Sequence, residues 1–380
     1  MSADPAAASA TGSQPPGSLA GITVVDLSRV LGGPYATQIL GDHGARVIKL
    51  EPPQGDETRA WGPPFYRDGV AWYYAGVNRN KEVRTIDLRT DEGRAELRAL
   101  LAEADVLVEN FRPGTLENWG LGYEETLREE FPRLIHCSIT GFGEDGPLGG
   151  MPGYDAIAQA MSGLMSVNGT PETGPTRIGM PAVDMITGLN AVNGILLALH
   201  ERSVSGRGQR VESTLFDSAL SVMHPHMPNL FGTGRAPGRT GNDHPNIAPY
   251  STYATGDGDV FLAVGNDRQF RRLCERIGRP ELASDARFAT NADRNGHRDA
   301  LRVELEAAFA SYEAVALGEA LMADGVPAGP ILDAQQAVDH PHTRHREMIV
   351  ELEDGYRGVA SPVRLSRTPA TYRIAPTGDS

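Results

Sequence analysis

The 380-residue sequence has few cysteines, no long uninterrupted apolar run and no excess of basic charge. Cys137 and Cys274 lie far apart and form no metal-ligand spacing, which predicts two core residues in a reducing cytoplasm and excludes a disulfide scaffold. The apolar stretch 189–199 is interrupted by polar residues, so we expect no membrane-spanning helix and no membrane partner. The net charge of -14 repels a phosphate backbone, so we expect no nucleic-acid partner.

Several ligand-binding and catalytic motifs are missing as well. The first strand-to-helix turn reads SRVLGGPYA instead of G-x-G-x-x-G, which argues against a bound dinucleotide. The sequence contains no P-loop, G-x-S-x-G or H-E-x-x-H pattern. The histidines in HPHMP (224–228) and DHPHTRHR (339–346) have no convincing set of further ligands, so we expect no metal site.

Strand and helix patterns alternate from residue 21 onward. Between two apolar strands, the segment PYATQILGDHG predicts a helix with proline near its start. This alternation predicts an α/β fold with a mostly parallel, doubly wound sheet, and chemistry in the loops near residues 140–190. The expected strands are 21–28, 45–51, 83–88, 105–111 and 133–143, and the expected helices between them are 34–44 and 90–104.

Changes in composition divide the chain. The N-terminal segment is rich in Ala, Ser, Pro and Gly and has no basic region followed by a hydrophobic stretch, which predicts a disordered leader instead of a signal peptide. A later stretch dense in Pro, Gly and Asn predicts a linker. The expected parts are a leader (1–18), a large domain (19–223), a linker (224–250), a small domain (251–335) and a segment that returns to the large domain (336–380).

One carboxylate, Asp184, begins the otherwise apolar helix pattern RIGMPAVDMITGLNAVNGILLAL. Aspartate is a common N-cap, because its carboxylate accepts hydrogen bonds from the first turn of a helix. Such a cap needs no further function, and helix geometry alone does not decide whether Asp184 has one. Asp155, which precedes another amphipathic pattern, is similarly a candidate N-cap of its own helix.

Six segments taken in order carry a family resemblance over residues 19–370. The sequence resembles the class III coenzyme A transferases, the family of formyl-CoA transferase, carnitine CoA-transferase and the 2-methylacyl-CoA racemases. The resemblance implies a large Rossmann-like domain, a smaller α+β domain and an interlocked homodimer. The segments are VVDLSRVLGGPYATQILGDHGARVIKLEPPQGDETR, NRNKEVRTIDL, ADVLVENFRPGTLENWGLGYE, ITGFGEDGPLGGMPGYDAIAQAMSG, DMITGLNAVNGILLAL and SGRGQRVESTLFDS.

The resemblance also implies a mechanism and a site. Asp184 matches the nucleophile, which forms an anhydride and then an aspartyl-CoA thioester, with acyl-CoA and small carboxylic acids as substrates. A helix N-terminus would keep such a carboxylate ionised. Matched positions for coenzyme A are Arg29, Val30 and Gly32 in the first turn, Ile86, Asp87 and Arg89 near the adenine and phosphates, and Asn110 and Phe111 beside the pantetheine, with Tyr154 lining the active site.

Departures from individual relatives narrow the substrate. Leu31 replaces the glutamine of formyl-CoA transferase, and its tetraglycine loop is missing, which argues against formate and oxalate. Tyr154 stands where the racemases have histidine, and a phenol is a poor acid-base group near neutral pH. The segments DETRAWGPPF and HPNIAPYSTY resemble transferases that use succinyl-CoA to activate dicarboxylic acids. A 2-methylacyl-CoA racemase and a non-catalytic acyl-CoA-binding protein, in which Asp184 is only a cap, remain the alternatives.

Overall fold

The computed structural model describes residues 17–376, so the expected leader lies almost entirely outside the described residues. The described chain divides into two compact units. The first comprises residues 17–164, 178–224 and 344–376, and the second comprises residues 165–177 and 225–343. Residues 165–177, which the sequence division places in the large domain, therefore belong to the second unit.

A six-stranded sheet forms the centre of the first unit, in the order β3-β2-β1-β4-β5-β6. All neighbouring strands are parallel. This is the strand order of doubly wound sheets: β2 and β3 are added on one side of β1, and β4, β5 and β6 are added on its other side. The predicted architecture is therefore confirmed. The strands are β1 (Thr23–Asp26), β2 (Arg46–Glu51), β3 (Lys81–Thr85), β4 (Val106–Glu109), β5 (Ile135–Thr140) and β6 (Arg210–Thr214).

Helices and short turns connect these strands. The chain passes between the two units four times: in α7 (Leu164–Val167), after residue 177, after residue 224 and in α16 (Pro341–His345). The other elements of the first unit are α1 (Gly32–Asp42), η1 (Glu57–Ala60), α2 (Trp72–Ala75), α3 (Asp91–Leu101), α4 (Thr115–Asn118), η2 (Tyr123–Leu127), α5 (Arg128–Glu130), α6 (Asp155–Met161), α8 (Ala182–Ser205), α9 (Leu215–Ser221) and the antiparallel pair β10 (Ile349–Glu351) and β11 (Arg357–Val359).

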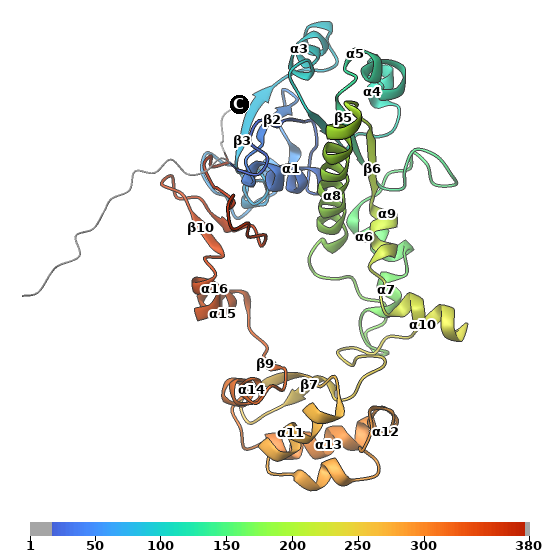
Figure 1. The fold of residues 1–380 in the computed structure, drawn as a ribbon, viewed down its shortest axis with the longest axis vertical. Helices are drawn as coiled ribbons and strands as arrows, with labels where there is room; N and C mark the ends of the chain where they lie inside the picture. Colours follow the sequence, from blue (N-terminus) through green and yellow to red (C-terminus); the bar gives the residue numbers. More distant parts are fainter. Residues whose placement is uncertain (1–16, 377–380) are drawn as a thin grey trace, which may run out of the picture. The chain divides into compact units, whose positions relative to one another are not determined.

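Both faces of the large sheet are covered (Figure 1). Successive strand residues point to opposite faces, so neighbouring residues of β1 enter different cores. Val24 packs in one core with Leu40 of α1 and Ile195 of α8. Val25 packs in the other core with Leu97 of α3. The predicted cysteine burial is confirmed, because Cys137 lies unpaired in the first of these cores.

Helix α8 is the one described helix that is long and apolar enough to cross a membrane by length and composition. A core helix of a globular protein passes the same test, and 44% of the apolar window of α8 is buried. Ala191, Val192 and Ile195 bury one of its faces in the sheet core. In the fold, α8 therefore serves as a packing helix of the sheet.

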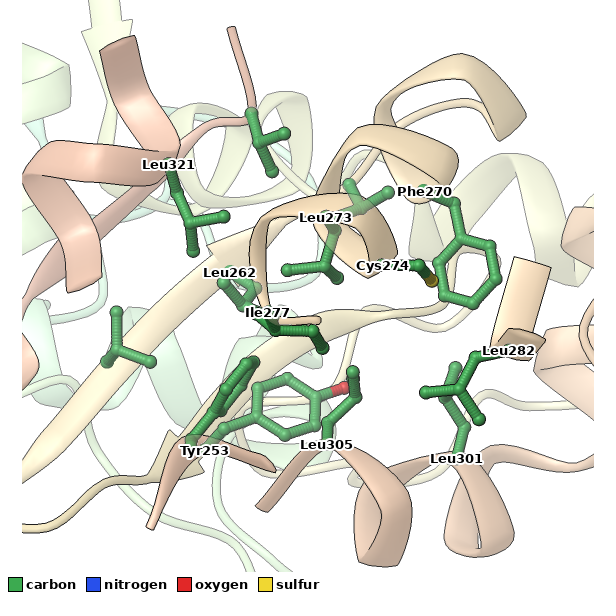
Figure 2. Close-up of a cluster of buried hydrophobic side chains, with 14 of the residues drawn as sticks. Tyr253, Leu262, Phe270, Leu273, Cys274, Ile277, Leu282, Leu301, Leu305 and Leu321 are labelled. Atoms are coloured by element: carbon green, nitrogen blue, oxygen red, sulfur yellow. The ribbon is translucent and has the colours of Figure 1, made fainter. Parts of the chain in front are cut away.

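The second unit contains a three-stranded antiparallel sheet, β7-β8-β9. Its core forms where α11, α13 and α14 pack on β8, and Figure 2 shows Leu262, Phe270, Leu305 and Leu321 in this cluster. Residues 224–250, the expected linker, contain the helix α10, whose C-cap residue Gly234 has a positive φ of 67°. The elements are α10 (His226–Thr233), β7 (Tyr250–Ala254), β8 (Asp259–Ala263), α11 (Asp267–Arg276), η3 (Pro280–Ser284), α12 (Asn291–Gly296), α13 (Arg298–Phe309), α14 (Ala314–Ala323), β9 (Ala328–Pro330) and α15 (Ala334–Asp339).

The last described residues are tied to the first unit by Asn80. The Asn80 side-chain amide donates to the Thr371 carbonyl at 2.8 Å and accepts from the backbone N–H groups of Arg373 and Ile374. Its backbone N–H donates to the Ile374 carbonyl at 2.8 Å. Asn80, which is buried, thus holds residues 371–374 against the start of β3.

Candidate active site

The loops that follow β1 and β4 meet at the carboxyl edge of the sheet, where such folds bind ligands. Asn110, directly after β4, accepts a hydrogen bond from the Arg29 backbone N–H at 2.9 Å. Its amide nitrogen donates to the Arg29 carbonyl at 2.7 Å. Because both polar atoms of this side chain are used, Asn110 holds the turn after β1 in a fixed position.

Buried charged side chains also hold the turn after β1. Lys49 donates to the Ser28 carbonyl at 2.7 Å and pairs with Asp56, while Lys81 pairs with Asp26 at 3.1 Å. All four ionisable side chains are buried. Burial lowers the pKa of Lys81 to about 8. Burial also opposes ionisation of Asp26, but Lys81 and Lys49 hold the pKa of this carboxyl below its ordinary value.

A cavity of about 220 Å³ opens between these loops and the start of α8. Asp184 is the only acidic side chain among the described residues that line it, and they include no serine, cysteine, lysine or histidine. The other nucleophilic oxygens belong to Thr140, which accepts a hydrogen bond from the Gly143 N–H, and Tyr154, which is 63% exposed. The cavity is lined by Arg29, Val30, Leu31, Gly32, Asn110, Phe111, Arg112, Pro113, Ile139, Thr140, Gly141, Met151, Pro152, Gly153, Tyr154, Asp184 and Leu215.

Close contact between α1 and α8 brings Asp184 to this cavity. A Cβ on Gly188 would lie 2.6 Å from the Gly32 carbonyl, and a Cβ on Gly32 would lie 3.2 Å from the Asp184 carbonyl. The absence of side chains at these two positions lets the starts of the helices touch. Asp184 therefore lies beside the turn after β1, although 152 positions separate it from Gly32 in the chain.

The predicted N-cap role of Asp184 is wrong. Asp184 is the third residue of α8, Pro181 occupies the cap position, and no side-chain cap bond forms there. Asp155 supplies the cap from another helix: it accepts hydrogen bonds from the N–H groups of Val183 at 2.7 Å and Asp184 at 3.2 Å. Asp155 is also not the N-cap of its own helix, because α6 begins at Asp155 and is preceded by Tyr154.

The expected ionisation of Asp184 also needs correction. Burial, and then the neighbouring charge of Asp155, raises the pKa of Asp184 to about 7. At this helix terminus the N–H groups of Val183 and Asp184 bond to Asp155 and not to the Asp184 carboxylate. Burial followed by the charges of Asp184 and Asp155 also raises the pKa of Tyr73 in α2.

A second cavity of about 340 Å³ lies beside the first. Arg29, Phe111 and Arg112 line both cavities. The Phe111 and Trp119 rings meet edge to face, with centroids 5.6 Å apart. The second cavity is lined by Leu27, Arg29, Leu50, Pro52, Gln54, Ile86, Asp87, Leu88, Arg89, Phe111, Arg112, Thr115 and Trp119.

One ion pair stands at the exposed side of this second cavity. The Arg89 guanidinium donates to the Asp87 carboxylate at 2.7 and 2.8 Å. These bonds, together with the Arg89 backbone N–H, hold the pKa of Asp87 at about 2. Asp87 is therefore already paired, whereas the exposed Arg89 keeps other N–H groups available to an anion.

The family resemblance named ten site residues, and all ten line one or both of the two cavities. The motif analysis missed Arg112 and Trp119, although Arg112 directly follows Phe111. It also missed the contact of Asp155 with α8, for which local sequence contains no signal. No group of three His, Cys, Asp or Glu side chains suited to a metal ion occurs within residues 17–376.

A parallel sheet with cavities at its switch point is typical of an α/β enzyme that binds a nucleotide-containing molecule. The sequence profile of CoA-transferase family III matches residues 19–379. The chain belongs to this family, as the sequence resemblance predicted, and is a CoA-transferase.

Individual relatives agree with this assignment. The chain is 44% identical to succinate–glutarate CoA-transferase of Agrobacterium fabrum, over 93% of this chain and 91% of that protein. It is 41% identical to acetyl-CoA:oxalate CoA-transferase of Acetobacter aceti, over 94% of this chain and 91% of that protein. A solved CaiB/BaiF family protein from Brucella suis has a TM-score of 0.86 and 42% identity, with 96% of each chain covered.

Proposed function

We propose that this enzyme moves CoA from succinyl-CoA to a dicarboxylic acid and that Asp184 is its nucleophile. One observation carries the proposal: Asp184 is the sole carboxylate among the described residues that line the cavity at the switch point. A carboxylate can form a mixed anhydride, which keeps the acyl group activated until thiolate returns. A hydroxyl nucleophile would instead give an ester, which thiolate attacks far less readily.

The proposed reaction balances in two halves. An Asp184 oxygen attacks the succinyl carbonyl, the carbon–sulfur bond breaks, and CoA leaves as thiolate. The thiolate then attacks the Asp184 carbonyl of the anhydride, which releases succinate and leaves an aspartyl-CoA thioester. The acceptor carboxylate then attacks this thioester, and thiolate leaves again, which gives a second anhydride between Asp184 and the acceptor. The thiolate attacks the acceptor carbonyl of this anhydride, which forms the acceptor CoA ester and releases the Asp184 carboxylate.

The shared lining of the two cavities supports a single extended site for acyl-CoA. The apolar walls of the second cavity, which include Ile86 and Trp119, suit the flat adenine ring. The guanidinium groups of Arg29, Arg89 and Arg112 suit its phosphates. The first cavity then receives the thioester, beside Asp184.

The names of the two relatives support a dicarboxylic acceptor, because glutarate and oxalate are both dicarboxylates. Arg29 and Arg112 are the cationic side chains that line the first cavity, and either fits the second carboxylate of such an acid. The first name pairs succinate with glutarate, and succinyl-CoA is proposed as the donor on that basis, whereas the second name gives acetyl-CoA.

A homodimer is the proposed assembly, as the family resemblance implies. Helix α8 supports this proposal by exposing Leu196, Leu197 and Val204 to the extent of 41%, 71% and 83%. Light scattering at catalytic concentrations tests it, because an active monomer would contradict the assignment.

A transfer assay tests the function. The enzyme is mixed with succinyl-CoA and glutarate, oxalate or mesaconate, and the CoA esters are separated by chromatography. Asp184→Asn is expected to lose at least about 1,000-fold in kcat, since no other described residue that lines the cavity carries a carboxylate. Asp217→Asn, which removes an exposed acid of α9, is the matched control with unchanged activity. An equally active Asp184→Asn enzyme would rule out this nucleophile, and deuterium uptake at carbon 2 without an acceptor would favour a racemase.

A further inference from the structure

Asp155 contacts the backbone of the proposed nucleophile directly. Its Oδ1 accepts from the N–H groups of Val183 and Asp184, and its Oδ2 accepts from the Gln159 amide at 2.6 Å. Only 7% of Asp155 is exposed. A buried carboxylate is costly unless it is well satisfied, and these three donors satisfy it.

Gln159 contacts Ile178, at the start of the segment that leads into α8. Its Oε1 accepts from the Ile178 N–H at 2.9 Å, and its amide nitrogen donates to Asp155. Residues 178–184 are therefore held at both ends by side chains of α6, one turn apart. The position of Asp184 depends on this pair of side chains as well as on α8.

We propose that Asp155 is a positioning residue of CoA transfer, which fixes the Asp184 backbone and, as a second buried anion, favours the acylated form of Asp184. The inference rests on the proposed nucleophilic role of Asp184. When Asp184 attacks a thioester, its negative charge passes to the departing thiolate and the anhydride left behind is neutral. Acylation thus removes the repulsion between two neighbouring carboxylates, which shifts the equilibrium toward the covalent intermediate.

The groups around Asp184 give Asp155 this influence. The raised pKa of Asp184 has burial as its first cause and Asp155 as its second. The elements packed on α8 contribute uncharged lining to the cavity, namely Gly32 of α1, Ile139 of β5 and Leu215 of α9. Among the described residues, the other charged or titratable groups that share the cavity lining with Asp184 are Arg29, Arg112 and Tyr154. The charge of Asp184 also acts on Tyr73 of α2.

Two substitutions separate the charge of Asp155 from its hydrogen bonds. Asp155→Asn keeps an acceptor for the α8 N–H groups but removes the charge and places an amide N–H where Gln159 needs an acceptor. Asp155→Glu keeps the charge and displaces it by one methylene. Asp217→Asn again serves as the control. For each enzyme, kcat/KM is measured from pH 5 to pH 9, and intact mass gives the fraction that carries a CoA adduct at equilibrium with succinyl-CoA.

For wild type, kcat/KM is expected to rise with pH through a midpoint near 7, because the nucleophile must be ionised. In Asp155→Asn the midpoint should fall by about one pH unit and the adduct fraction should decrease. Asp155→Glu should keep the midpoint and lose kcat, and Asp217→Asn should resemble wild type.

Two outcomes would overturn the inference, and they are distinguishable. If Asp155→Asn forms the adduct on Asp184 with an unchanged midpoint and an unchanged adduct fraction, Asp155 has only a structural role and the proposed function stands. If wild type forms no adduct on Asp184, the inference and the proposed nucleophile both fail.

Discussion

Replacing Asp184 by asparagine should stabilise the protein in a pH-dependent way. Burial and the Asp155 charge raise the pKa of this carboxyl from 3.8 to about 7 in the folded protein. Between these values the folded state keeps a proton that the unfolded chain has lost, so wild-type stability falls as the pH rises from about 4 to about 7 and then levels off. Asparagine does not titrate, so the Asp184→Asn protein does not lose this stability as the pH rises.

The magnitude follows from the displaced pKa. A shift of about three pH units corresponds to roughly 4 kcal/mol. Asp184 is buried in part and not fully, so solvent screening reduces this to about 1–2 kcal/mol. We therefore expect Asp184→Asn to unfold at the wild-type temperature at pH 4.5 and roughly 1–3 °C higher at pH 8.

Thermal unfolding of both proteins between pH 4.5 and pH 8.5 measures this difference. Asp217→Asn, which lacks an exposed charge, should show no such growth with pH over the same range. A constant gap between wild type and Asp184→Asn would refute the raised pKa and, with it, the idea that a buried carboxylate is kept ready for acylation.

Three further substitutions test other parts of the structure. Lys81→Met leaves the buried Asp26 charge unpaired and should cost about 3–5 kcal/mol in denaturant unfolding, while the double variant with Asp26→Asn should lose less. Trp119→Ala removes a wall of the second cavity and should raise the KM for acyl-CoA about tenfold with kcat nearly unchanged; a kcat loss alone would contradict the proposed adenine site. Gly188→Ala drives a Cβ into α1 and should lower Tm and activity, whereas Gly296→Ala, with no atoms nearby, should change neither.

Much of the sheet was predictable from local sequence, and the family resemblance named many of the residues that line the cavities. Apolar strands alternating with amphipathic helices imply a parallel sheet, and residues directly after strands, such as Arg29 and Asn110, then lie at its carboxyl edge. The register of helix pairs and the depth of burial were not predictable. Lys49 and Lys81 are ordinary lysines in the sequence, yet both are fully buried beneath the first turn.

Asp155 shows the same limit within the active site. A carboxylate before an amphipathic pattern predicts a cap on its own helix, since capping rules count only a few positions along the chain. Its partners instead lie 28 and 29 residues away, at the start of α8. Tertiary contact therefore determined both the cap of α8 and the ionisation of Asp184, and sequence spacing contains no trace of either.

The covalent intermediate offers the most direct test of the central claim. The enzyme is incubated with succinyl-CoA, its intact mass is recorded, and the adduct is trapped with hydroxylamine or borohydride and mapped by peptide mass spectrometry. The account predicts a CoA-sized adduct whose trapped derivative maps to Asp184 and is missing from Asp184→Asn. An adduct on Thr140 or Tyr154, an adduct that persists in Asp184→Asn, or no adduct with any acyl-CoA would contradict it.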